Sequence, residues 1–582
     1  MYRPEHPNPQ FMRKNWQNLN GEWDFEIDYG NSGNERGMYS KNAEFATKIN
    51  VPFCPQSELS GIGIKDFMSS VWYKRVFNIS EEQLSGRVLL HFGAVDFEAT
   101  VWVNGENVGK HYGGYSSFSF DITSKLKVGE NIVTLNAKDD VRSGNQPIGK
   151  QSVEYAPRFA WYTRTIGIWQ TVWLEFVPET YIKSFKYYPN IVETAFDIDI
   201  NLSSKGIVTV EAFYEDRLVG IKEQETLGNN LKINIPLKEK HLWGVGEGNL
   251  YQIKITLKTN DSCDEVLSYA GLREVTVDGF KVLINGKSVF QRTVLDQGFY
   301  PDGIYTAPNE EALIRDIDLS LELGFNGARL HEKIFEPRFL YHCDRKGYLV
   351  WGEHANWGLM SDRESALQNF LPEWIEAVER DFNHPSIIGW CPLNEIWDQY
   401  GGDTDTGRRF IKSVYDITKA IDRTRPVIDV SGGFHICGDI FDQHDYDQNP
   451  ESFRAKYTGF DGKLGSIHFE FENKQKFLTD KPFYMSEYGG IKWVPDFKKD
   501  SENEKDWGYG DAPKTEEEFF ARYEGLTESL LEAPNIMGFC YTQLYDVEQE
   551  VNGLYTYERE KKFDDYSRII VANTKKATIE KQ

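Results

Sequence analysis

Residues 387–395 read Ile387-Ile388-Gly389-Trp390-Cys391-Pro392-Leu393-Asn394-Glu395, an apolar run of strand length that ends in a carboxamide and a carboxylate. A buried parallel strand is a continuous hydrophobic run, and in a barrel of alternating strands and helices the functional groups follow such strands. A second run of this kind, Pro482-Phe483-Tyr484-Met485-Ser486, ends in Glu487. Two carboxylates at two strand ends predict an acid and a nucleophile that work as a pair.

Strands alternate with helices from about residue 278 to the end of the chain, a pattern typical of βαβ units. The clearest helix covers residues 310–323, where apolar residues recur at helical spacing, and Gly324 ends it. Further helices are predicted at 336–346, 371–383, 409–421 and 516–531, and strands at 325–330, 348–352, 387–391, 427–430, 439–441, 483–486 and 536–541. Residues 278–582 are therefore predicted to form a catalytic (β/α)8 TIM barrel.

The chain before this barrel alternates apolar and polar residues with a period of two, which indicates half-buried strands. Residues 1–178 include Asn104-Gly105 between two such runs, the strongest short signal of a β-hairpin. We expect a jelly-roll β-sandwich there and an immunoglobulin-like β-sandwich over residues 179–277. A second hairpin, around Asn285-Gly286, marks the start of the barrel. The predicted fold class is thus multidomain, with two β-sandwiches and a TIM barrel.

Composition excludes several classes of partner. With 65 Lys and Arg against 90 Asp and Glu, the net charge of −25 repels phosphate backbones, so no nucleic-acid partner is expected. No apolar run approaches the length of a membrane span, and the N-terminus opens no signal-peptide core. The six cysteines form no CxxC pair, which favours reduced thiols. We expect a cytoplasmic protein without a membrane partner, and a homo-oligomer stays open.

Several local patterns resemble those of glycoside hydrolase family 2, the family of β-galactosidases, β-glucuronidases and β-mannosidases. They occur in the segments 18–23, 101–105, 164–169 and 381–386, in Asn394-Glu395 and in Glu487-Tyr488-Gly489. The likeness covers nearly the whole chain, and the order of the three predicted domains is also that family's order. The resemblance implies a retaining exo-glycosidase with Glu395 as acid/base and Glu487 as nucleophile. It further implies that Asn394 binds the 2-hydroxyl of an oligosaccharide or glycoside substrate.

The chemistry of retention fits these residue types independently of the resemblance. One carboxyl group protonates the leaving oxygen while another attacks the anomeric carbon, and the two groups lie about 5 Å apart. The fourth and seventh strands of a barrel can supply such a pair from opposite sides of one site. The alternative interpretation is that both carboxylates merely end strands without a chemical role.

Supporting residues are predicted from their positions after barrel strands. Arg329 and His331 match basic residues of the family, and Tyr488 would steady the nucleophile by a hydrogen bond; for His331 and Tyr488 a packing role is the alternative. His444 and His468 belong to polar clusters that line the site or serve structure. Aromatic residues that stack on a sugar or pack in the core are Tyr541, Trp357, Trp397, Trp493 and Trp507.

No cofactor is required by this chemistry. Glu353, His354 and Asn356 follow the third barrel strand, where some members of the family bind a divalent ion. One glutamate and one histidine do not define a metal site, so we favour a hydrogen-bonded role and count Glu353 among the substrate-binding candidates.

The identity of the sugar rests on weaker signals. Family β-glucuronidases bind the uronate with an Asn-x-Lys motif, whereas the corresponding Asn552-Gly553-Leu554 has no lysine, so glucuronides are disfavoured. Asp296 follows the first barrel strand and is expected to bind a hydroxyl in place of the family's usual residues. By family frequency we expect a β-galactosidase, with β-D-galactofuranosidase or α-L-arabinofuranosidase activity as the alternative. A sugar-binding protein that has lost catalysis is the alternative from a different class.

Overall fold

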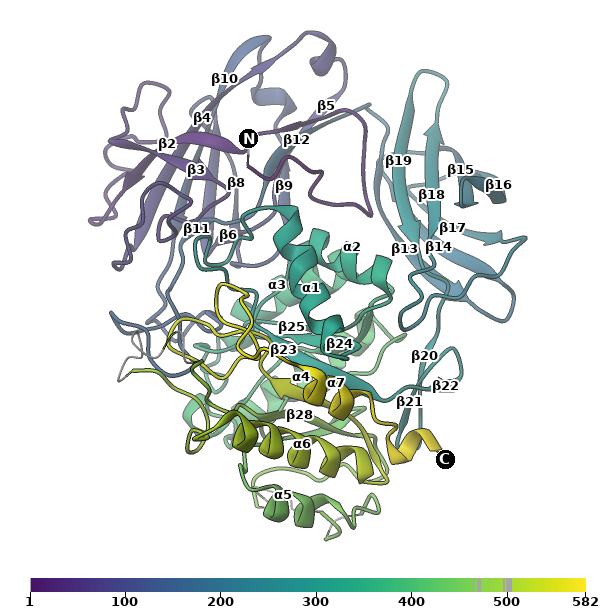
Figure 1. The fold of residues 1–582 in the computed structure, drawn as a ribbon. Helices are drawn as coiled ribbons and strands as arrows, with labels where there is room; N and C mark the ends of the chain where they lie inside the picture. Colours follow the sequence, from purple (N-terminus) through teal and green to yellow (C-terminus); the bar gives the residue numbers. More distant parts are fainter. Residues whose placement is uncertain are drawn as a thin grey trace.

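The computed structural model describes residues 2–463, 465–467, 471, 473–495, 498 and 505–581. Figure 1 shows two β-sandwiches side by side and, below them, an α/β region that contains the C-terminus. This arrangement confirms the predicted fold class: sandwich, sandwich and barrel follow one another along the chain.

The N-terminal sandwich has two antiparallel sheets, ordered β3-β2-β4-β10-β7-β8 and β1-β12-β5-β9. Apolar side chains that alternate along the strands, such as Trp23, Leu90 and Leu135, meet in one core. Asn104 and Gly105 connect β7 to β8 with φ of 53° and 83°, as the hairpin prediction requires. The strands are β1 (Trp16–Asn18), β2 (Gly21–Ile27), β3 (Thr47–Val51), β4 (Ser70–Ile79), β5 (Arg87–Phe92), β6 (Val95–Asp96), β7 (Glu98–Val103), β8 (Glu106–Tyr112), β9 (Phe118–Asp121), β10 (Gly129–Lys138), β11 (Gly167–Ile168) and β12 (Val172–Val177).

The second sandwich packs the sheet β13-β14-β17 against the sheet β16-β15-β18-β19. Its core holds the inward side chains of alternating strands, among them Ile198, Val210 and Ile255. A three-stranded meander, β20-β21-β22, follows and leads into the barrel. The strands are β13 (Ile182–Asn190), β14 (Ala195–Leu202), β15 (Gly206–Tyr214), β16 (Arg217–Thr226), β17 (Asn230–Pro236), β18 (Tyr251–Lys258), β19 (Cys263–Ala270), β20 (Val275–Asp278), β21 (Lys281–Ile284) and β22 (Lys287–Ser288). We keep 1–178, 179–277 and 278–582 as proposed domain ranges.

The barrel region is built on a curled parallel sheet, which in the described residues has the order β26-β25-β24-β23-β29-β28-β27. Its strands are almost entirely buried, and β25, β26 and β29 are mainly apolar, whereas β23 and β27 also carry polar side chains. The strands are β23 (Gln291–Asp296), β24 (Gly327–Leu330), β25 (Leu349–Glu353), β26 (Ile387–Cys391), β27 (Phe441–Asp445), β28 (Phe483–Gly489) and β29 (Ile536–Thr542). The helices are α1 (Glu310–Glu322), α2 (Pro337–Lys346), α3 (Ala366–Asp381), α4 (Asp405–Ile421), α5 (Pro450–Tyr457), α6 (Glu516–Glu532) and α7 (Ser567–Thr574).

Several predicted elements differ from the structure: α4 begins at Asp405 rather than at 409, and the strand predicted at 439–441 is β27, Phe441–Asp445. The segment predicted as a strand at 427–430 makes only isolated bridges, of Val427 to Trp390 and of Ile428 to Gly438. The next residue, Ser431, bridges to Asn394, and the segment lies between β26 and β27. Helix α3 begins at Ala366 rather than at 371. The expected start placed Pro372 in the first turn, where proline is tolerated, but the helix continues through this residue.

The N-terminal sandwich is hydrogen-bonded directly to the barrel. The Glu373 carboxylate on α3 accepts from the backbone N–H groups of Tyr115, at 2.5 Å, and Ser116, at 3.2 Å. Arg13 joins the two sandwiches, since it donates to Glu175 of β12 and to Asp264 of β19, each at 2.9 Å. These buried contacts fix sandwich loops relative to the barrel.

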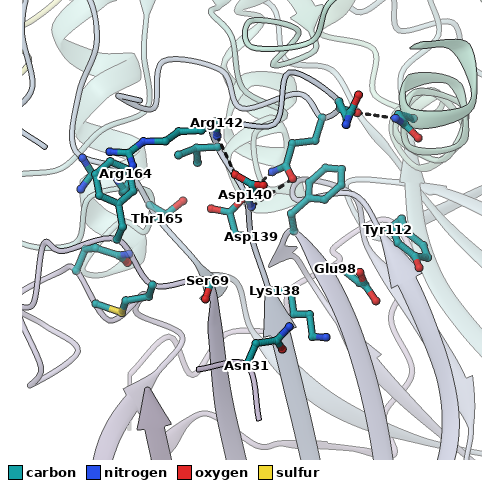
Figure 2. Close-up of a pocket in the computed structure, with 18 residues that line it drawn as sticks. Asn31, Ser69, Glu98, Tyr112, Lys138, Asp139, Asp140, Arg142, Arg164 and Thr165 are labelled. Atoms are coloured by element: carbon teal, nitrogen blue, oxygen red, sulfur yellow. Dashed lines mark hydrogen bonds between the residues drawn. The ribbon is translucent and has the colours of Figure 1, made fainter. Parts of the chain in front are cut away.

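A cavity of about 570 Å³ lies where the N-terminal sandwich meets α3, and Figure 2 shows its lining, which includes Asp139, Arg142 and Arg164. Arg164 donates to the Lys65 carbonyl at 2.7 Å, and its guanidinium lies 3.7 Å from the centroid of the Phe67 ring. No residue expected at the catalytic site lines this cavity. The family-like segment around Arg164 therefore shapes the sandwich.

Among the described residues, no helix combines the length and apolarity needed to span a bilayer. All six cysteines are unpaired, as expected for reduced thiols, although Cys263 is exposed.

Candidate active site

Glu395 and Glu487 converge at the carboxyl end of the parallel sheet. Glu395 follows β26 and Glu487 lies on β28, with 9% and 4% of each residue exposed. One carboxylate oxygen from each glutamate and one ring nitrogen of His444 on β27 all lie within 4.8 Å of one another. Carboxyl groups about 5 Å apart suit attack and protonation on one anomeric centre, whereas water-mediated inversion needs roughly 6.5–9.5 Å.

The surroundings of Glu487 favour its ionised form. Arg329 donates to Oε1 at 3.1 Å, and the Tyr446 hydroxyl donates to Oε2. Burial opposes ionisation, but the positive charges of His444 and Arg329 outweigh it and lower the pKa of Glu487 from 4.5 to about 2. Glu487 is therefore a carboxylate at neutral pH, as a nucleophile must be.

His444 lies between the two glutamates. Its Nδ1 is 2.8 Å from Oε1 of Glu395, and its Nε2 is 3.4 Å from Oε1 of Glu487 and 3.1 Å from the Ser431 hydroxyl. Burial lowers the pKa of His444, but the neighbouring carboxylates outweigh burial and raise it. The three ligand atoms could geometrically surround a cation, but the hydrogen bond between His444 and Glu395 already occupies two of them.

A fully buried guanidinium connects the residues around Glu487. Arg329 donates to Glu353, to the Ser486 carbonyl at 2.7 Å and to Oδ1 of Asn394 at 3.2 Å. Glu353 also lies 3.2 Å from Nδ1 of His331. Because these bonds engage both carboxylate oxygens of Glu353, it orients Arg329 and His331.

The hydrogen bonds of Asn394 fix its position and leave its side-chain Nδ2 without a partner in the described residues. Its backbone N–H donates to Oδ1 of Asn356 at 2.6 Å, and its carbonyl accepts from Nδ2 of Asn356 at 3.0 Å. Arg329 occupies Oδ1 of Asn394, whereas the buried Nδ2 has no partner in the described part of the chain. A buried unpaired amide is unfavourable unless a ligand bonds to it, which fits the expected substrate hydroxyl.

The backbone of Glu395 is in the left-handed region, with φ of 49°. A non-glycine residue in this region is strained, and such strain persists where the surrounding structure fixes it. The Glu395 N–H donates to the Ser431 carbonyl at 2.8 Å, so the irregular segment between β26 and β27 holds this turn.

A series of aromatic side chains leads outward from Tyr446, which donates to Glu487. The Tyr446 ring stacks on Tyr509 with centroids 3.4 Å apart, Tyr509 contacts Trp507 at 4.8 Å, and Trp507 contacts Phe159 of the N-terminal sandwich at 6.0 Å. Phe159 is 52% exposed. The expected candidate Trp507 thus lies on a route from the carboxylates to the surface.

Three expected site residues are not brought to the carboxylates. The Tyr488 hydroxyl pairs with Thr527 of α6, and the Tyr541 ring packs against Tyr488 in the core. Successive side chains of a strand face opposite sides, so Tyr488 points to the helices when Glu487 points to the site. Asp296 accepts from the Tyr545 hydroxyl and from the Gly298 N–H, and burial raises its pKa to about 6.

One expected residue lies outside the described part of the chain, and others were not foreseen. His468 belongs to the segment that is not described. Tyr446 could have been inferred, because it follows His444 by two residues and so extends the same face. Lys150, whose charge helps to lower the pKa of Glu487, and Tyr509 come from loops whose sequences carry no comparable signal.

Two family models match the chain. The model described as "Glycosyl hydrolases family 2, sugar binding domain" matches residues 16–142. The model described as "Glycosyl hydrolases family 2, TIM barrel domain" matches residues 275–493, a range that includes both glutamates.

Relatives of similar sequence carry two names. A β-galactosidase of Thermoanaerobacter pseudethanolicus is 28% identical over 447 residues, which cover 73% of this chain and 54% of the relative. A β-glucuronidase of Chlorocebus aethiops is 25% identical over 528 residues, covering 81% of this chain and 78% of the relative. The chain therefore spans about half the length of that β-galactosidase.

Solved structures share the fold along the whole chain. A β-glucuronidase from an uncultured Clostridium sp. has a TM-score of 0.80 at 20% identity and covers 97% of this chain and 99% of its own. The Ruminococcus gnavus β-glucuronidase with uronic isofagomine has a TM-score of 0.82 at 19% identity and covers 99% of this chain and 100% of its own.

Proposed function

The chain belongs to glycosyl hydrolases family 2, and we propose that it releases terminal non-reducing sugars with retention, using Glu487 as nucleophile and Glu395 as acid/base. It is a glycosidase, and the two residue roles are our assignment. The observation that carries the assignment is the separation of at most 4.8 Å between one oxygen of each carboxylate.

In the first proposed step, the Glu487 carboxylate attacks the anomeric carbon while Glu395 gives a proton to the glycosidic oxygen, which leaves with its aglycone as an alcohol. Arg329 and Tyr446 orient the attacking carboxylate, and Nδ2 of Asn394 binds a sugar hydroxyl. In the second step, Glu395 takes a proton from water, the resulting hydroxide attacks the anomeric carbon, and the ester to Glu487 breaks. Both carboxyl groups thereby return to their starting states.

The stereochemical course tests this mechanism. We expect proton NMR of a nitrophenyl β-glycoside reaction to show the β-anomer of the free sugar first, with the α-anomer appearing later by mutarotation. Two successive inversions at one carbon give this result, whereas initial release of the α-anomer would exclude a glycosyl ester on Glu487.

The proposal also concerns which sugar the enzyme releases. β-Galactosides and β-glucuronides are both candidates: relatives named β-galactosidase support the first, and relatives named β-glucuronidase support the second. Galactofuranosides and arabinofuranosides complete the set to assay. A protein that only binds sugars would turn over none of them.

Tyr446 provides a test of how the nucleophile is held. We expect Tyr446→Phe to lower kcat roughly 10- to 100-fold, because a hydrogen bond to a charged group is lost. Tyr488→Phe is the matched control, since the Tyr488 hydroxyl bonds to Thr527 instead. Steady-state kinetics of both variants measure this difference in kcat. An equal loss of kcat in the two variants would mean that Tyr446 does not act on Glu487.

A further inference from the structure

Lys150 reaches the catalytic site from the N-terminal sandwich. Its loop is fixed to the loop after β25: Ile148 N–H donates to the Trp357 carbonyl at 2.8 Å, and Gly149 N–H donates to the Ala355 carbonyl at 3.1 Å. Gly149 has φ of +59°, and a Cβ at this position would lie 2.5 Å from the Glu332 carbonyl oxygen. This close approach requires glycine and places Lys150 directly over the barrel.

The Lys150 side chain is buried but its ammonium has no anionic partner among the described residues. The residue is only 5% exposed, and Nζ lies 3.7 Å from the centroid of the Trp357 ring. A cation over an indole face is favourable, but this contact leaves the three N–H donors without acceptors. Nζ is not among the enclosed side-chain atoms that lack a partner in the described residues, so its donors stay accessible to a ligand that enters the site.

Although Lys150 is far from Glu395 in sequence, a short series of contacts connects the two residues. Trp357 follows Asn356, whose side chain exchanges two hydrogen bonds with the backbone of Asn394, the residue before Glu395. The charge of Lys150 also reaches across the site, since it contributes to the low pKa of Glu487.

The nearby carboxylates already have donors of their own. Glu550 accepts from the Tyr162 hydroxyl and from Nδ2 of Asn552 at 2.9 Å. Oε2 of Glu332 accepts from the Trp357 N–H at 3.0 Å, whereas its buried Oε1 has no hydrogen-bond partner in the described part of the chain. In the described part of the chain neither forms an ion pair with Lys150, which leaves the ammonium free for a group on the substrate.

We propose that Lys150 binds an anionic substituent on the sugar in the catalytic site and thereby selects acidic glycosides over neutral ones. This inference rests on the proposed function and names the substrate class of the same site. A uronic carboxylate and a sulfate ester share the required chemistry.

The first experiment compares kcat/KM for nitrophenyl β-glucuronide, β-galacturonide and β-galactoside 6-sulfate with the neutral β-glucoside and β-galactoside. We expect the wild type to prefer one acidic substrate at least about tenfold over its neutral parent, since a charge-assisted hydrogen bond is at stake. The uronides and the sulfate distinguish the two sources of negative charge. Lys150→Met, which keeps the packing on Trp357, should bring the ratio close to one.

Lys110→Met is the matched control, because Lys110 lies exposed on β8 of the same sandwich and pairs with Glu98. A wild-type preference for the neutral sugars would overturn the proposal. So would a Lys150→Met variant that loses activity equally on acidic and neutral substrates, because Lys150 would then act only on the charge of Glu487.

A binding measurement separates this inference from the proposed mechanism. Calorimetry with D-glucaro-1,5-lactone and D-glucono-1,5-lactone compares an acidic and a neutral ring without requiring turnover. Tighter binding of the acidic lactone by the wild type, lost in Lys150→Met, supports the role of Lys150 even where no glycoside is cleaved. Equal affinities in the wild type contradict it, whatever the outcome for Glu487.

Discussion

Glu487→Gln is expected to lower kcat by about 10⁴-fold or more. The amide is neutral and a poor nucleophile, so it cannot form the glycosyl ester. Glu487 also carries a full charge in the wild type, since its pKa of about 2 lies far below neutral pH. The ionised form is thus available throughout the range in which such an enzyme works.

Mass spectrometry after incubation with a 2-deoxy-2-fluoro glycoside gives a direct readout. The wild type should gain one fluorosugar on the peptide that contains Glu487, and the glutamine variant should gain none. Because the substitution removes an acceptor from Arg329, thermal unfolding must show that the variant is folded. Glu487→Gly with added azide is the second variant: the small anion should fill the gap and yield the inverted glycosyl azide. A labelled peptide from elsewhere in the chain would contradict the assignment.

Glu395→Gln is expected to lower kcat/KM by roughly 10²- to 10⁴-fold for a substrate with an alcohol leaving group. A dinitrophenyl glycoside should lose far less in the first step, because its phenolate leaves without a proton. The difference between the two substrates is the mark of a lost general acid.

Azide also tests the second step, in which the glycosyl ester on Glu487 is broken down. It attacks the glycosyl ester without help from a base, so azide should accelerate the dinitrophenyl reaction of the Glu395 variant and give a β-glycosyl azide. Equal losses for both leaving groups, with no effect of azide, would assign Glu395 to substrate binding alone.

The order of the domains and most elements were predictable because their signals are local. Period-two alternation defined the sandwiches, the Asn-Gly pairs at 104–105 and 285–286 gave two hairpins with positive φ, and continuous apolar runs gave β26 and β28. The segment at 427–430 was predicted as a strand from composition. It makes only isolated bridges, because the chain turns at Ser431 to hold the Glu395 backbone.

The candidate site was predictable only in part. The two glutamates follow apolar runs, so each could be found from its own neighbours. Tyr488 stands beside Glu487 in sequence but faces helix α6, whereas Tyr446, forty-one residues earlier, donates to the carboxylate. The side chains of adjacent residues on a strand point to opposite faces of the sheet, whereas side chains from neighbouring strands can meet on one face.

By itself, the sequence determined the three-part architecture and the two carboxylates, because hydrophobic periodicity and strand ends depend on residues close together in the chain. Only the tertiary structure decided that the carboxylates lie within 4.8 Å, that His444 lies between them, and that Lys150 joins them from another domain. Those contacts connect segments separated by tens to hundreds of residues. They arise from how the strands and loops pack together, which no local pattern encodes.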